Sequence, residues 1–460
     1  MSEASLSTHA TSARRRRVPP GPSPFTEIPR NPANDPRFFQ KLVDQREQWG
    51  EVVRIGLPGM SRYIVNHPDD VQHVLHDNYR NYTKDCFEYA MLRLVIGRGL
   101  VTSDGDLWRR QRRLAAPAFT PKRVAAFAGS MTQACSAMIE RWAPIADSPE
   151  PIEVGSEMMD VTLRIVGDAL FGFDTSGESS QVGPAFGTAM EIMMGRSPLS
   201  FPLWVPTRKN RRFNAAMATL RGLVELIIDE RRREPGDRGD LLSGLMQARD
   251  EETGEAMDAE LLRDEVLTLL LAGHETTAMA LTWCFYRLSL HPEVQRRLVD
   301  EIDAVLGGRT PGPEDLPSLR VTRQVIEETM RLHPPVWAIA RVAREADEVG
   351  GYPVRPGQVL FLSPYSTHRH PDFWENPEGF DPDRFTPERI RAQHRFAYFP
   401  FAAGARICIG NNFALLEAGI ILAMVMQRYR LELAPGRPVE PRALVTLRPR
   451  DGMWMRVRAR

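Results

Sequence analysis

The residue most informative about chemistry is Cys408, which lies in a glycine-containing segment directly before a predicted helix. Residues 401–410 read FAAGARICIG. Gly404 and Gly410 permit tight turns, and backbone amides at the start of the helix can donate to the sulfur and stabilise a thiolate. Arg406 adds positive charge beside it. A cysteine taken alone would be interpreted as structural, but the whole pattern favours an anionic sulfur that ligates a metal.

The other three cysteines, Cys86, Cys135 and Cys284, are far apart in the sequence and form no CxxC pair. A disulfide framework or a zinc site is therefore not expected. We interpret them as small, buried, apolar side chains, which is the usual role of a free cysteine.

A second candidate cluster lies in the apolar segment 264–290, where Glu275 and Thr276 are neighbours. A buried carboxylate is costly unless it is hydrogen-bonded or paired, and a threonine hydroxyl can bond the carbonyl four residues earlier. The alternative interpretation is a satisfied polar cluster in the core. Thr277 is a weaker candidate, and His274 is interpreted as a packed histidine rather than a ligand.

Five segments, taken together, resemble the cytochrome P450 family. The 401–410 segment is similar to the family's haem-binding loop, and AGHETT at 272–277 is similar to its oxygen-activation segment. The other similar segments are the WxxxR helix at 108–112, the ExxR helix at 328–331 and the FDPDRF stretch at 380–385. They occur in the family's order, and the flanking strands extend the resemblance to roughly residues 35–460.

The resemblance implies haem b, iron protoporphyrin IX, as the cofactor. Cys408 would be the axial iron ligand, whose thiolate pushes electron density onto the iron and favours O–O cleavage. Phe401 would pack near the sulfur and limit water there. The two haem propionates need cations, and arginine pairs with carboxylates in a bidentate way. The other cofactor-binding residues implied by the resemblance are Trp108, Arg112, Arg341 and Arg406.

The resemblance gives Thr276 and Glu275 a catalytic role, which is the delivery of protons to bound dioxygen from a locally opened helix that holds water. It also implies that Arg384 joins Glu328 and Arg331, which share a helix face, in a buried network. Such a network is weak evidence for net stability, but breaking it leaves a buried charge alone. We therefore interpret these three residues as structural.

The function that follows is that of a haem-dependent monooxygenase, which inserts one atom of dioxygen into a hydrophobic small molecule such as a fatty acid, steroid or terpenoid. Electrons would come from NAD(P)H through a separate ferredoxin and ferredoxin reductase. The alternatives are a peroxide-driven haem-thiolate oxygenase or isomerase, and a haem sensor or carrier without turnover. Glu275 and Thr276 argue against both, because neither alternative needs a proton relay to dioxygen.

The resemblance also places the substrate pocket and the face through which electrons enter. Arg109, Arg110 and Arg113 are expected to face solvent and to attract an acidic ferredoxin-type donor, although a solvated helix face is the alternative. About half of the candidate pocket residues are expected to be ordinary core. These candidates are Phe87, Leu92, Leu94, Met193, Met194, Phe201, Trp204, Leu271, Val336, Trp337, Ile339 and Met453.

The elements that must position these residues indicate an α+β fold that is mainly α. A strand, turn and strand are predicted over 51–66, followed by a mostly helical region over 68–333. Within it, residues 264–290 are apolar nearly all round and should form one long helix through the core. The last predicted elements are short strands after residue 335, a helix over 410–428 and a small hairpin over 445–458.

We expect one large P450-like domain over residues 31–460, with small peripheral sheets and a flexible, basic and proline-rich tail over 1–30. The 59 basic residues balance the 59 acidic ones, which argues against a dedicated nucleic-acid binder. The sequence contains no run of about 18 apolar residues, so no membrane span is expected. The N-terminal segment lacks the apolar region of a secretory signal, so it is not expected to be one. The protein is thus expected to be cytoplasmic. The Arg14–Arg17 run is interpreted as solvated, with a membrane or nucleic-acid contact as the alternative.

Overall fold

The computed structural model describes residues 18–23, 32–56, 61–175, 179–197, 200–234, 236, 238–249, 254 and 256–460. The predicted tail over 1–30, including the Arg14–Arg17 run, lies outside these residues except at 18–23. There, the Pro20 carbonyl accepts a hydrogen bond of 2.8 Å from the Arg54 amide. The turn at 57–60 between the first two predicted strands also lies outside.

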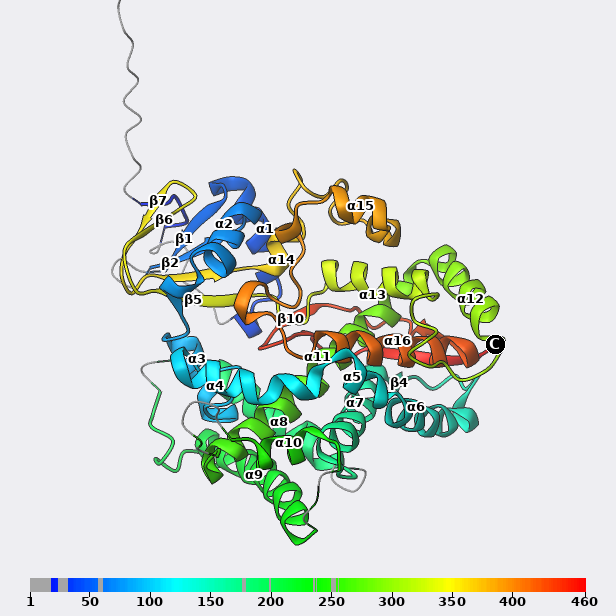
Figure 1. Ribbon diagram of the computed structural model, residues 1–460. Helices are drawn as coiled ribbons and strands as arrows, with labels where there is room; N and C mark the ends of the chain where they lie inside the picture. The colour runs from blue at the N-terminus through cyan, green and yellow to red at the C-terminus, as the bar shows by residue number, and fades with distance from the viewer. Residues whose placement is uncertain are drawn as a thin grey trace, which may run out of the picture.

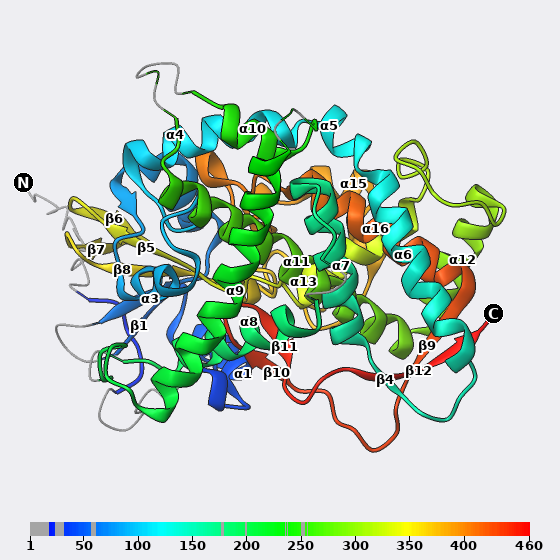
Figure 2. The ribbon, with the colours of Figure 1, turned by 90° about the horizontal axis from the view of Figure 1, so that it is seen from below.

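Helices make up most of the described chain, and α11 lies at its centre (Figures 1 and 2). The helices are α1 (Phe38–Trp49), α2 (Pro68–Gln72), α3 (Phe87–Ile96), α4 (Gly105–Ala115), α5 (Pro121–Ala126), α6 (Ala128–Trp142), α7 (Val154–Phe171), α8 (Ser179–Met194), α9 (Arg208–Arg233), α10 (Leu241–Gln247), α11 (Ala259–Leu290), α12 (Pro292–Leu306), α13 (Arg320–Leu332), α14 (Pro364–Thr367), α15 (Pro387–Ala392) and α16 (Asn411–Arg428).

The strands form small sheets, the largest of which lies beside α1 and α2 at the upper left of Figure 1. This sheet has the order β1 (Val52–Ile55), β2 (Arg62–Val65), β8 (Val359–Leu362), β5 (Ile339–Ala343) and β3 (Tyr82–Thr83). The other sheets pair β6 (Asp347–Val349) with β7 (Tyr352–Val354), β10 (Pro441–Ala443) with β11 (Leu447–Pro449), and β12 (Trp454–Ala459) with both β4 (Ile152–Glu153) and β9 (Tyr429–Leu433). The predicted mainly α fold with peripheral sheets is confirmed.

The predicted terminal hairpin is wrong, because its two strands belong to different sheets. β11 pairs with β10, whereas β12 pairs along its length with β9, from Met455 opposite Leu433 to Ala459 opposite Tyr429. Alternation within β12 buries Met455 and Val457, and β9 offers a matching buried face. Alternation along the sequence shows that a strand forms, but it does not show which strand becomes its partner.

The long central helix is confirmed, and it begins earlier than predicted. Asp258 caps α11 by accepting a hydrogen bond of 2.7 Å from the Leu261 amide, so the helix includes a polar first turn that periodicity did not indicate. It ends at Leu290, directly before His291 and Pro292. Its residues are buried on all sides along the middle, as its apolar composition predicts.

The predicted network around Arg331 is present, and within it Arg331 and Glu328 are completely buried. Nε and Nη2 of Arg331 donate to the two carboxylate oxygens of Glu328 at 2.6 and 2.8 Å. Its Nη atoms also donate to the carbonyls of His368, Pro377 and Gly379 at 2.7–2.9 Å. Arg384 Nε lies 3.5 Å from Glu328 Oε1. The network therefore ties α13 to the irregular segment that leads toward Cys408.

Glu328→Ala should lower the free energy of unfolding by about 3–5 kcal/mol, because it leaves the Arg331 guanidinium buried without its counter-charge. The matched control is Glu388→Ala, whose partner Arg391 is 74 % exposed, and which should cost about 0–1 kcal/mol. Urea unfolding of both variants measures the two values. Equal losses would show that the buried pair contributes no more than a surface pair.

Candidate active site

An internal cavity of about 350 Å³ lies between α11 and the loop that precedes α16. All eight predicted site residues line it, although they are spread over 300 positions of the sequence between 108 and 408. They are Trp108, Arg112, Glu275, Thr276, Arg341, Phe401, Arg406 and Cys408.

Cys408 lies on one wall of the cavity, in a loop whose backbone is tightly fitted. The Cys408 amide donates to the Phe401 carbonyl at 2.9 Å. Gly404 has a φ of +64°, and a Cβ there would lie 2.0 Å from the Leu75 carbonyl oxygen, so only glycine fits. Cys408 is the one exposed cysteine among the four, and it lines the cavity.

The charges around the sulfur differ in part from the prediction. Burial raises the pKa of the Cys408 thiol, while the Gly410 amide and the Arg112 guanidinium act to lower it. The predicted amide donor is thus present, but the cation that acts on the sulfur is Arg112 rather than Arg406. A bound metal ion deprotonates a coordinating thiol outright, so burial does not prevent Cys408 from acting as a ligand.

Arg406 instead packs on α4. Its guanidinium lies 3.7 Å from the centre of the Trp108 ring, forms an ion pair with Asp104 and donates to the Ser103 carbonyl at 3.0 Å. Burial is the main cause that lowers the pKa of Arg406 to about 10. Arg112 donates to the Ile407 carbonyl at 2.9 Å, which joins α4 to the cysteine loop.

A further cation at the cavity, Lys84, was missed in the sequence analysis. Its Nζ donates to the Val101 carbonyl at 2.6 Å, and the residue is 8 % exposed. Burial, together with Arg341 and Arg406, lowers the pKa of Lys84 well below its ordinary value. A lysine just after a short strand carries no distinctive spacing, so only the folded chain reveals its position.

The four cations at the cavity have few counter-charges. Among the described residues, Asp104 is the one carboxylate that forms an ion pair with any of Lys84, Arg112, Arg341 and Arg406. Buried charges in proteins are normally paired. This end of the cavity is therefore suited to a ligand with two negative charges, and haem with its two propionates fits it, with the Cys408 sulfur on the adjoining wall.

The opposite wall is formed by the middle of α11. The Thr276 hydroxyl donates to the Ala272 carbonyl at 2.8 Å, as expected of a threonine inside a helix. The predicted local opening of the helix is absent, since α11 runs without a break. A Cβ at Gly273 would lie 3.0 Å from Val166 Cγ2, so glycine there allows α7 to approach closely.

Glu275 is held by two residues near the C-terminus that the sequence analysis did not single out, one in β11 and one in the turn before it. Its Oε1 accepts hydrogen bonds of 2.6 Å from Arg448 Nε and 2.5 Å from Thr446 Oγ1, and Arg448 Nη2 forms an ion pair with it. The need for a partner was predictable, because a buried carboxylate must be satisfied. Its identity was not, because the partner lies 173 positions away in the sequence.

The remaining site predictions had mixed outcomes. His274 is packed, with Nδ1 2.8 Å from the Leu270 carbonyl and its ring against Phe186, and burial lowers its pKa. Four of the twelve candidate pocket residues line the cavity, namely Leu92, Leu271, Val336 and Ile339. The other eight do not line it, and Phe201 and Trp204 are 67 % and 82 % exposed.

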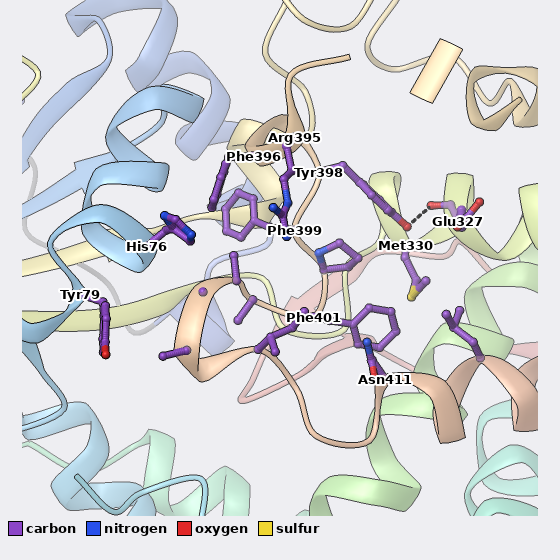
Figure 3. Close-up of a pocket in the computed structure, with 17 residues that line it drawn as sticks. His76, Tyr79, Glu327, Met330, Arg395, Phe396, Tyr398, Phe399, Phe401 and Asn411 are labelled. Atoms are coloured by element: carbon purple, nitrogen blue, oxygen red, sulfur yellow. Dashed lines mark hydrogen bonds between the residues drawn. The ribbon is translucent and has the colours of Figure 1, made fainter. Parts of the chain in front are cut away.

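A second hollow, of about 640 Å³, lies on the other side of the cysteine loop (Figure 3). His76 and Tyr79 border it on one side, and Arg395 and Tyr398 border it on another. The Tyr398 hydroxyl donates to the Glu327 carbonyl at 2.9 Å. The cysteine loop thus separates the internal cavity from a hollow on the surface.

The profile of the Cytochrome P450 family matches residues 19–454. The chain therefore belongs to the cytochrome P450 family, whose cofactor is haem and whose co-substrate is dioxygen.

Among characterised relatives, the chain is 38 % identical over 402 residues to cyclooctatin synthase of Streptomyces melanosporofaciens, covering 86 % of each chain. It is 35 % identical over 413 residues to pentalenene oxygenase of Streptomyces avermitilis, covering 89 % of this chain and 91 % of the relative. The heme domain of cytochrome P450DA superposes with a TM-score of 0.86 at 28 % identity, covering 97 % of this chain and 99 % of that one. The chain is accordingly a P450 monooxygenase, an oxidoreductase.

Within the described residues, no helix is both long and apolar enough to cross a bilayer.

One buried carboxyl group outside the predicted site, that of Glu265, binds the backbone at the cavity's edge. Glu265 Oε2 accepts a hydrogen bond of 3.0 Å from the amide of Leu100, which lines the cavity. Burial, with a smaller contribution from Asp264, raises the pKa of Glu265 to about 7, although the Leu100 amide opposes the shift. The folded chain therefore favours the protonated form.

The raised pKa of Glu265 should make the free energy of unfolding depend on pH, and Glu265→Gln should remove that dependence. The stability contributed by a protonated Glu265 is complete below its ordinary pKa of 4.5 and is lost as the pH rises through 7. The variant should thus match the parent near pH 4 and exceed its unfolding free energy by about 3 kcal/mol at pH 8. Denaturant unfolding at several pH values, with exposed Glu293→Gln as control, measures the difference. A constant difference across pH would contradict the prediction.

Proposed function

We propose that this monooxygenase oxidises a hydrophobic, terpenoid-type small molecule, with electrons supplied by a separate partner. The observation that carries the proposal is the cavity itself, where the cysteine and the cation cluster meet an apolar region lined by α3, α8 and α11. Relatives named for cyclooctatin and pentalenene favour a terpenoid over the fatty acids and steroids that the sequence left open. Sugars and nucleotides do not suit such a lining, because their polar groups would be buried without partners.

In this proposal, Cys408 ligates the haem iron, and Lys84, Arg112, Arg341 and Arg406 balance the propionates. Trp108 packs beneath Arg406 and limits the positions open to its guanidinium. Phe401 lines the cavity next to the sulfur and keeps water away from it. When bound, haem supplies the activation of dioxygen and the oxygen transfer, which are chemistry of the cofactor.

The protein's own contribution to the reaction is the supply of protons from α11. The Thr276 hydroxyl is at the cavity, and Glu275 is the carboxylate next to it in the chain. The hydrogen bonds from Arg448 and Thr446 both go to Glu275 Oε1, so Oε2 is the oxygen that would exchange a proton with a water at Thr276. Arg448 is therefore a positioning residue, which sets the resting place of Glu275.

The proposed electron donor is a ferredoxin, reduced with NAD(P)H by a ferredoxin reductase. Arg109 and Arg113 on α4 are exposed, as expected. Arg110 is half-buried and donates to the Ala256 carbonyl at 3.1 Å, so it is less exposed than its two neighbours. The donor would approach the face of the cysteine loop, where the surface hollow brings it near Cys408. Local positive charge would steer an acidic donor. This assignment is compatible with a cytoplasmic location.

The test of the function uses the holoenzyme with a ferredoxin, its reductase, NADPH and labelled dioxygen. A cyclic terpene hydrocarbon should shift the haem spin state and yield a product with one labelled oxygen atom. Cys408→Ser should lose the strongly red-shifted Soret band of the ferrous CO complex together with product formation, whereas Cys284→Ser should keep both. Retention of that band in Cys408→Ser would refute the ligand assignment, and spin shifts confined to polar compounds would refute the substrate class.

Thr276→Ala should keep the CO spectrum but separate NADPH use from product formation, with more hydrogen peroxide released. Glu275→Gln should slow product formation by about 10²–10⁴-fold, the usual contribution of a positioned acid or base. Thr282→Ala is the matched control, because Thr282 makes the same bond, to the Ala278 carbonyl at 2.7 Å, without lining the cavity. Unchanged coupling in both site variants would exclude the proposed proton supply.

A further inference from the structure

A third hollow, of about 720 Å³, opens at the surface beside α3, and we call it the lateral hollow. Its walls are α3, the connection from α3 to α4, and the edge formed by β3 and β5. α3 and α4 lie below β5 at the left of Figure 1. The residues that line it differ from those that line the internal cavity and from those around the hollow beside the cysteine loop. The lateral hollow is therefore separate from the site already described.

Three arginine side chains line the lateral hollow from different elements. Arg93 belongs to α3, Arg98 to the connection that follows it, and Arg344 comes directly after β5. Arg93 Nη2 donates to the Thr102 carbonyl at 3.1 Å, which fixes one side of its guanidinium. Within the described part of the chain, none of the three arginines forms an ion pair with a carboxylate. Their positive charges therefore add up in one place.

The acidic residues at the lateral hollow do not balance these cations. Two carboxylates line it, those of Asp85 and Asp104. Asp104 is already paired with Arg406, which is a cation of the internal cavity. Asp264 on α11 also attracts Arg98, but Asp264 does not line the hollow. Within the hollow, the three arginines are thus opposed by the exposed carboxylate of Asp85, which leaves an excess of positive charge.

A buried hydroxyl group at the lateral hollow lacks a hydrogen-bond partner. Ser103 is 4 % exposed, and its Oγ finds no partner among the described residues. The neighbouring Thr102 hydroxyl lines the same hollow but donates to the Gly97 carbonyl at 2.6 Å. Burying a hydroxyl without a hydrogen bond is costly, so an acceptor atom in the hollow would satisfy Ser103. This observation is independent of the arginines and also points to a ligand with oxygen acceptors.

We propose that the lateral hollow binds a small phosphate-type anion that carries several negative charges, of which diphosphate is the simplest example. Guanidinium groups bind phosphate oxygens through pairs of parallel hydrogen bonds, and three of them match an anion with more than one phosphate group. The Ser103 hydroxyl would donate to a further oxygen of the ligand. A volume of about 720 Å³ lies within the range of small-molecule sites, which favours a small ligand over a macromolecule.

Two residues of the lateral hollow connect it to the internal cavity. The Ser103 carbonyl accepts a hydrogen bond of 3.0 Å from Arg406, and Asp104 forms an ion pair with the same guanidinium. Arg406 lines the cavity at the end that suits the propionates. A bound anion would therefore place negative charge behind a cation of the cofactor site. With haem bound, that charge favours ferric over ferrous iron, so anion binding should lower the midpoint potential.

The experiment is isothermal titration calorimetry of the full-length holoenzyme with sodium diphosphate at constant ionic strength. Arg93→Gln, Arg98→Gln and Arg344→Gln combined should weaken binding by at least about 100-fold, because a hydrogen bond to a charged group contributes about ten-fold in affinity. Ser103→Ala should weaken binding about five-fold, whereas its free energy of unfolding without the anion should stay unchanged, since no existing bond is lost. Redox titration of the parent should give a lower midpoint potential with diphosphate than with sodium chloride.

The matched control variant carries the same changes elsewhere on the surface. Arg233→Gln, Arg296→Gln and Arg320→Gln remove three exposed charges outside the lateral hollow, and this variant should bind diphosphate as the parent does. Sodium citrate is the control for the ligand, because it carries several negative charges on carboxylates instead of phosphates, and it should bind more weakly than diphosphate. All variants should retain the ferrous CO spectrum.

Three outcomes would overturn the proposed site. The first is that the parent does not bind diphosphate. The second is that the triple arginine variant of the hollow binds it as well as the parent, which would assign binding to another surface. The third is that citrate binds as tightly as diphosphate, which would show a positive surface without preference for phosphate. An unchanged midpoint potential with diphosphate bound would overturn the connection to the cavity. Anion binding does not rest on the proposed substrate class, so its failure would leave that class untouched.

Discussion

The arrangement of the site depends on one electrostatic constraint, which is that four basic side chains are gathered at one end of the cavity with few counter-charges. Lys84, Arg112, Arg341 and Arg406 come from four different parts of the chain, and Asp104 is the one described carboxylate that pairs with them. Burying unpaired charge is costly, so the surrounding elements have to supply carbonyl and aromatic partners. A dianionic ligand would offset the remaining cost, and binding it to the folded chain alone would stabilise the fold. Cofactor binding and folding are thereby linked through electrostatics.

Two helices, α11 and α13, position the walls of the cavity. α11 passes through the core and brings Thr276 and Glu275 to the cavity, while the C-terminal strand β11 holds Glu275 from behind through Arg448. α13 is anchored by Arg331 to the carbonyls of the segment that leads to the cysteine loop. The opposite walls are consequently held by hydrogen bonds between segments that are far apart in the sequence.

By itself, the sequence determined the mainly helical fold and the long central helix, because these depend on periodicity within short segments. Its short motifs also carried the resemblance that implied the family and the eight residues around the cavity. It did not determine the partners of those residues. Arg448 beside Glu275, Lys84 beside Arg406 and the pairing of β12 with β9 join positions far apart in the chain, and the exposure of Phe201 and Trp204 was not predicted. Only the tertiary structure decided these, because a side chain's surroundings are set by packing between distant segments, which local patterns do not encode.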